Sequence, residues 1–85
     1  MSVYAEASSV VHDQEQKYGP FTPDVAGVRL ALAVLQDEVT EALGAWRDER
    51  RDPHWIDTRC EVMQVAAVAL RLVEAIDRAS EPSGE

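Results

Sequence analysis

The sequence predicts an all-α fold. Its apolar residues recur with helical spacing, glycines and prolines divide that pattern into three segments, and no segment alternates as a strand would. We expect a long helical hairpin packed against a shorter N-terminal helix, in a single domain covering residues 1–79. Residues 80–85 contain no core residue, so we expect a disordered tail there.

The first predicted helix covers about residues 3–17. Its helical stripe consists of Val3, Ala7, Val10, Val11 and Gln14. Gly19 and Pro20 end the helix, because glycine accepts the left-handed exit and proline cannot continue the turn.

The second predicted helix covers about residues 23–48. Thr22 supplies an N-cap hydroxyl, Pro23 suits the first helical position, and Asp24 suits the positive end of the helix. An apolar seam with steps of three and four residues follows the helix: Val28, Leu32, Leu35, Val39, Leu43 and Trp46. We expect this seam to be a packing surface.

The third predicted helix covers about residues 53–79, and Asp52 and Pro53 repeat the cap-and-proline signature at its start. Its centre, residues 65–70, is apolar on nearly every side, as in helices that are buried all round. One chain of 85 residues cannot cover such a helix. We therefore expect a homo-oligomer, a dimer or a tetramer, with a multi-helix bundle assembled across subunits.

Charge and composition exclude several function classes. The net charge is −8, from 16 acidic and 8 basic side chains, which argues against binding duplex nucleic acid or an anionic membrane surface. The N-terminus lacks the features of a signal peptide, and the longest apolar run is too short to cross a bilayer. Cys60 is the only cysteine, which fits a reducing cytoplasm, and we expect it to be buried.

Some acidic residues occupy positions where a solvated residue is not expected. Glu38 shares its helix strip with small apolar residues, and Glu41 lies one turn along at the edge of that strip. On the third helix Glu61 shares a strip with valines and a leucine, and Asp57 and Gln64 lie beside it. Two helices therefore each present acids from an apolar surface.

Clustered carboxylates on such surfaces need compensation, because burial and mutual repulsion both disfavour their charge. Arg29, Arg47 and Arg59 are the nearest basic residues in sequence, and all three point to the far sides of their helices. A divalent cation is the simplest solution, and carboxylate oxygens suit Mg²⁺ or Mn²⁺. The strips leave a second interpretation open, in which Glu38 and Glu61 lie at the margin of the core with their carboxylates in water.

Two acidic motifs resemble those of a known enzyme family. Residues 37–41, Asp-Glu-Val-Thr-Glu, and residues 61–64, Glu-Val-Met-Gln, are similar to the paired acidic runs of the MazG-like all-α nucleoside triphosphate pyrophosphohydrolases. Residues 13–19 resemble the lysine–aromatic–glycine stretch of phage-type members, and residues 61–69 resemble their apolar third helix. The resemblance covers about residues 13–76.

The resemblance implies Mg²⁺-dependent hydrolysis of a nucleoside triphosphate to the monophosphate and pyrophosphate. Glu38, Glu41 and Glu61 match metal-binding acids, and Asp37 matches the leading acid of the first run. Asp37, or a metal-binding acid that the cation leaves free, would then take the proton of the attacking water.

One position departs from the family pattern. Gln64 stands where the family has an aspartate, and its amide oxygen can ligate a cation without supplying charge. Asp57, one turn before Glu61, is the alternative ligand. The sequence does not indicate which base such an enzyme would read.

Two further residues are minor candidates for substrate binding. Lys17 would contact a phosphate, although an exposed lysine at a helix end is the commoner role. Trp55 would stack on a base, although tryptophans beside a turn more often pack in a core. The rival function for the whole chain is a non-catalytic helical dimerisation or interaction module on the same scaffold.

Overall fold

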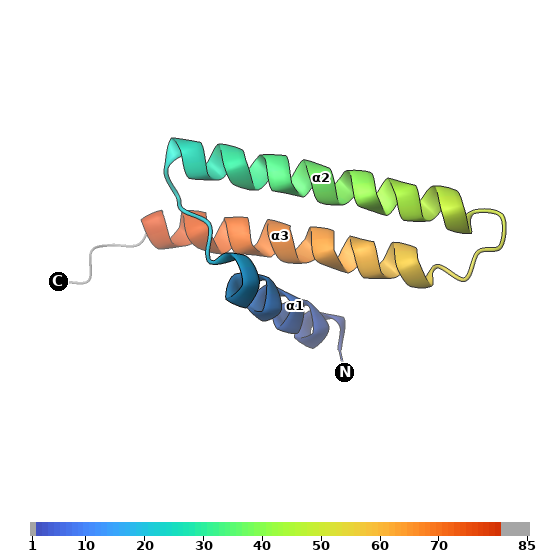
Figure 1. Ribbon diagram of the computed structural model, residues 1–85. Helices are drawn as coiled ribbons and strands as arrows, with labels where there is room; N and C mark the ends of the chain where they lie inside the picture. Colours follow the sequence, from blue (N-terminus) through green and yellow to red (C-terminus); the bar gives the residue numbers. More distant parts are fainter. Residues whose placement is uncertain (1, 81–85) are drawn as a thin grey trace.

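The computed structural model describes residues 2–80, which form three helices and no strand: α1 (Val3–Tyr18), α2 (Val25–Glu49) and α3 (Ile56–Ser80). α2 and α3 form a long antiparallel hairpin, and α1 packs against α3 without contacting α2 (Figure 1). The predicted all-α fold is confirmed. Ser80, assigned to the tail from the sequence, is the last residue of α3, and the rest of the predicted tail lies outside the described residues.

The start of α2 differs from the prediction by two residues. Its N-cap is Asp24 and not Thr22, and the Asp24 carboxylate accepts a hydrogen bond from the Gly27 amide at 2.9 Å. The Thr22 hydroxyl donates to the same carboxylate at 2.8 Å. Thr22 therefore supports the cap, because a charged carboxylate is the stronger acceptor for the free amides of the first turn.

The start of α3 differs more, because its cap comes from another helix. α3 begins at Ile56 and not at Pro53, after Trp55 with a φ of 61°. Glu49, at the end of α2 and only 4% exposed, accepts hydrogen bonds from the Asp57 amide at 3.0 Å and the Thr58 amide at 2.7 Å. The Thr58 hydroxyl donates to the same carboxylate. A residue-by-residue sequence analysis cannot assign a cap that is donated across a turn.

The intramolecular core is thin. The buried apolar residues are Ala7, Val11, Ala31, Met63, Ala67, Val68, Leu72 and Ala75, and four of these eight are alanine. α2 packs on α3 through small residues such as Ala31, and the predicted seam lies beside this contact. Leu32 and Leu43 of that seam are 51% and 49% exposed, so the seam is not the surface that packs on α3.

Two other expectations concern exposure. Cys60 is exposed, so its predicted burial is wrong; α1 does not close over it, and Cys60 lines a pocket together with Glu6 and Val10 of α1. Within residues 2–80 no helix combines the length and the apolar character that a membrane crossing requires.

Candidate metal centre

Three carboxylates from the two long helices converge at one place in the hairpin. Glu38 and Glu41 of α2 and Glu61 of α3 each place one oxygen within 4.8 Å of the other two. Glu38 and Glu61 are half-buried and Glu41 is exposed. We refer to Glu38, Glu41 and Glu61 as the carboxylate triad.

Helix geometry explains why these residues meet. Glu38 lies on the strip of α2 that faces α3, two turns after the fully buried Ala31. Glu61 begins the strip of α3 that faces α2 and that continues through Val68 and Leu72, both buried. Glu41 follows Glu38 by one turn and joins it from the edge of the same strip. The strips identified from the sequence therefore do face one another.

The triad is electrostatically crowded. Burial raises the pKa of Glu38 above its usual value, and the neighbouring charges of Glu41, Glu61 and Asp37 raise it further. Within residues 2–80 the ion pairs involve Glu6 and Glu49, so no described basic side chain pairs with the triad. Arg59 pairs with Glu6 of α1 at 2.8 Å, as expected for a residue that points away from the acids.

A pocket of about 330 Å³ adjoins the triad on the side of the hairpin that α1 approaches. Its lining comes from all three helices: Tyr18, Val34, Asp37, Glu38, Glu41 and Arg71. Asp37 is exposed and contributes to the repulsion on Glu38, so the structure does bring this predicted residue to the same site.

Arg71 is the residue of this pocket that the sequence analysis missed. Its side chain is only 3% exposed. Its guanidinium donates to the Gln14 side-chain oxygen at 3.0 Å and to the Gly19 carbonyl at 2.7 Å, and it lies 4.1 Å from the centre of the Phe21 ring. The sequence feature that could have identified Arg71 is its position between two leucines in an apolar stretch, because a charge buried there requires hydrogen-bond partners.

Gln64 is engaged with α1. Its side-chain oxygen accepts a hydrogen bond from the Gln14 amide nitrogen at 2.7 Å. Gln64 lines two small pockets beside α1, and it is not among the residues that line the carboxylate pocket. The Gln64 side-chain oxygen, which the resemblance assigns to the cation, therefore already accepts a hydrogen bond from α1.

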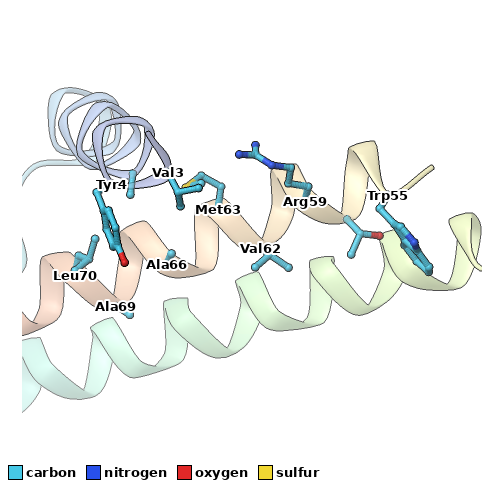
Figure 2. Close-up of a pocket in the computed structure, with 11 residues that line it drawn as sticks. Val3, Tyr4, Trp55, Arg59, Val62, Met63, Ala66, Ala69 and Leu70 are labelled. Atoms are coloured by element: carbon cyan, nitrogen blue, oxygen red, sulfur yellow. The ribbon is translucent and has the colours of Figure 1, made fainter. Parts of the chain in front are cut away.

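The other sequence candidates lie apart from the carboxylate pocket. Asp57 is exposed in the first turn of α3, where its amide is part of the Glu49 cap. Lys17 is exposed, and its ammonium group lies 5.2 Å from the centre of the Tyr18 ring. Trp55 lines a separate apolar groove of about 680 Å³ between α1 and α3 (Figure 2).

No protein-family model, curated protein or solved structure matches the chain. The resemblance to MazG-like enzymes therefore depends on the sequence motifs themselves, and the functional proposal below also depends on the carboxylate triad.

Proposed function

We propose that the protein is a Mg²⁺-dependent hydrolase that converts a nucleoside triphosphate to the monophosphate and pyrophosphate. The observation that carries this proposal is the convergence of Glu38, Glu41 and Glu61, from two helices, on one small volume. The order and spacing of these acids along the chain, which resemble the MazG-like pattern, connect that volume to phosphate chemistry.

The donor set fits a hard divalent cation. Three carboxylates supply oxygen ligands and a charge that exceeds that of one Mg²⁺ or Mn²⁺ ion. Glu41 is exposed and the adjoining pocket is open, so coordination positions remain for water and for phosphate oxygens. Burial raises the pKa of Glu38, repulsion from the neighbouring carboxylates raises it further, and a cation would remove that repulsion.

The residues of the pocket have separate roles in the proposed reaction. The cation would offset the charge of the phosphates and lower the pKa of a bound water. Asp37 at the rim would accept the proton of the attacking water. Attack at the phosphorus nearest the sugar breaks its bond to the bridging oxygen, and pyrophosphate leaves with that oxygen.

Beyond the triad, the proposed substrate contacts are those of Lys17 and Trp55, the two candidates from the sequence. Lys17 is next to Tyr18, which lines the carboxylate pocket, and in this proposal Lys17 would approach a phosphate group from the end of α1. Trp55 remains a candidate for stacking on the base. The proposed enzyme acts as a homo-oligomer.

One observation favours the rival function, a non-catalytic interaction module on this scaffold. The hydrogen bond from Gln14 to Gln64 makes the position of the missing aspartate part of the α1–α3 interface. A module of this kind would use the helices only for packing. Its stability would be independent of Mg²⁺.

A pyrophosphate-release assay over the common nucleoside and deoxynucleoside triphosphates tests the proposal. We expect release that requires Mg²⁺ and that falls by at least about 100-fold in Glu38→Gln, because a metal ligand is lost. Glu74→Gln is the matched control, since Glu74 is an exposed glutamate of α3 outside the triad. Metal-independent release, or equal rates in the two variants, would refute the proposal.

A further inference from the structure

Arg71 of α3 is a buried charge on the wall of the carboxylate pocket. The residue is only 3% exposed, and it lines the pocket together with Glu38 and Glu41. Within residues 2–80 no ion pair includes Arg71. Burying a guanidinium group without a counterion is costly, because the protein interior does not replace the water that solvates the charge. The burial of Arg71 at this place therefore requires an explanation.

Neutral groups hold the Arg71 guanidinium, and one of its donors is left over. Nη1 donates to the Gln14 side-chain oxygen at 3.0 Å, and Nη2 donates to the Gly19 carbonyl at 2.7 Å. The Phe21 ring lies against the guanidinium, with 4.1 Å between Cζ and the ring centre. The Nε atom is buried and has no hydrogen-bond partner among residues 2–80. Because arginine stays protonated in proteins, this N–H group needs an acceptor from elsewhere.

Gln14 fixes the orientation of the guanidinium from α1. Gln14 is 7% exposed, and its amide nitrogen donates to the Gln64 side-chain oxygen at 2.7 Å. Its oxygen is the end that faces Arg71, since an arginine can only donate. Both ends of the Gln14 amide are therefore engaged. A guanidinium that is already held in one orientation loses little conformational entropy when it binds a further acceptor.

The charges around the pocket determine which acceptor fits. The three carboxylates of the triad oppose the single positive charge of Arg71, so they would repel an anion from the pocket. A divalent cation on the triad would balance the two negative charges that Arg71 leaves over. An anion that binds between this cation and Arg71 would then meet positive charge on both sides. Anion binding at Arg71 should therefore require the cation.

Phosphate groups have the chemistry that both sides of the pocket require. Guanidinium groups form strong, charge-assisted hydrogen bonds with phosphate oxygens, and the same oxygens ligate Mg²⁺. A pyrophosphate unit carries oxygens on two phosphorus atoms, so one phosphate can bind the cation while the other accepts from Arg71. The pocket volume of about 330 Å³ is at the lower end of the range for small-molecule sites.

We propose that Arg71 is a phosphate-binding residue of the carboxylate pocket. Its Nε–H group donates to an oxygen of a pyrophosphate unit, and the other phosphate of that unit binds the divalent cation on the triad. The unit is either part of the nucleoside triphosphate or the released pyrophosphate. This assignment rests on the proposed function, which supplies the cation and the phosphate substrate. It adds a binding residue that lies outside both acidic motifs.

Titration calorimetry with inorganic pyrophosphate in excess Mg²⁺ tests the assignment with two matched variants. Arg71→Lys keeps the charge but lacks the fixed planar set of donors, so it should weaken pyrophosphate binding by at least about 10-fold. Its affinity for Mg²⁺ alone should equal that of the parent, because Arg71 is not a cation ligand. Arg78→Lys, at an exposed arginine in the last turn of α3, should bind pyrophosphate as the parent does. Equal pyrophosphate affinity in all three proteins overturns the proposal.

An NMR measurement on the parent keeps the test decisive if Arg71→Lys fails to fold. The Nε–H proton of Arg71 should shift downfield when pyrophosphate and Mg²⁺ are added together, because it then donates to a charged oxygen. It should not shift with Mg²⁺ alone or with pyrophosphate in EDTA, and the Nε–H proton of Arg78 should not shift at all. An unchanged Arg71 resonance overturns the proposal, since Nε then has no acceptor other than water. So does a folded parent that binds no pyrophosphate in Mg²⁺.

Kinetics separate this assignment from the proposed function and identify the source of the phosphate. A higher KM for the nucleoside triphosphate in Arg71→Lys places Arg71 on the substrate, whereas an unchanged KM with weaker inhibition by pyrophosphate places it on the product. If pyrophosphate is released but Arg71→Lys changes neither quantity, the assignment of Arg71 fails alone. If pyrophosphate binds at Arg71 but no nucleoside triphosphate is hydrolysed, the hydrolase fails and the phosphate site stands.

Discussion

Two glutamates on the same strip of α2 have opposite surroundings. Glu49 is 4% exposed, and although burial by itself raises its pKa, hydrogen bonds from Thr58 and Asp57 outweigh burial and hold the pKa below its usual value. Glu38, about three turns earlier, is less buried, yet burial and the neighbouring acids raise its pKa. The two carboxylates face the same helix, and among residues 2–80 only Glu49 has hydrogen-bond donors.

The difference separates a structural carboxylate from a candidate functional one. Glu49 is matched by the free amides at the start of α3, so its charge is used to hold the hairpin turn. Glu38 meets Glu41 and Glu61 instead, so its charge has no described partner and opposes folding. An acid held in an unfavourable place by the fold is a candidate for binding something that the apo-protein lacks.

The largest expected effect on stability comes from removing Glu49, the structural carboxylate. Glu49→Ala removes the cap of α3 and leaves two amides without an acceptor, so we expect the Tm to fall by on the order of 5–10 °C. Glu49→Gln keeps one accepting oxygen and should lose less. Thermal melts followed by circular dichroism measure both. An unchanged Tm in Glu49→Ala would show that the cap contributes nothing.

Glu38→Gln should behave in the opposite way. It removes one crowded charge at nearly constant shape, so in EDTA its Tm should equal or exceed that of the parent. Saturating Mg²⁺ should raise the Tm of the parent by several degrees and that of the variant little, because a ligand stabilises only the state that binds it. If Mg²⁺ leaves the Tm of both proteins unchanged and the two Tm values are the same, the triad does not bind Mg²⁺.

The same contrast predicts a pH dependence. The pKa of Glu38 is raised by folding, so its contribution to stability is complete below the unfolded value of about 4.5 and is lost as pH rises through the folded value. In EDTA the advantage of Glu38→Gln over the parent should therefore be present at pH 7 and should shrink toward pH 4. Comparing the two proteins cancels the opposite trend of Glu49. An advantage that grows on acidification would contradict the assignment.

The smallest expected effect concerns Gln64. Gln64→Asp adds an acid near the triad and shortens the side chain that accepts from Gln14, so we expect a destabilisation of only about 0.5–1 kcal/mol in EDTA. Cation affinity should change little, since the position belongs to the α1–α3 interface. Denaturant melts and Mn²⁺ titrations measure the two quantities separately. Tighter Mn²⁺ binding by Gln64→Asp would contradict this and would show that residue 64 lies at the cation site.

Periodicity predicted the parts of this structure that depend on one helix at a time. The three helices and the strips that carry Glu38 and Glu61 follow from residue spacing, because side-chain direction on a helix is set by its period. The cap from Glu49 and the partners of Arg71 were missed, because they join residues that only the tertiary fold brings together.

The sequence also did not determine which surface the apolar seam of α2 packs against. Spacing identified the apolar stripe through Leu32 and Leu43, but it does not determine which neighbour a stripe meets. Within the chain, α3 takes the adjacent strip of small residues around Ala31, since small side chains allow the closer approach of two helices. The larger residues of the seam, including Leu32 and Leu43, therefore stay exposed within the chain.

Titration calorimetry with Mn²⁺ measures whether the carboxylate triad binds a cation, independently of any substrate. We expect saturable binding at one or more sites per chain in the parent, weakened at least about 10-fold in Glu38→Gln and unchanged in Glu74→Gln. The absence of saturable binding in the folded parent, or equal affinity in all three proteins, would contradict it.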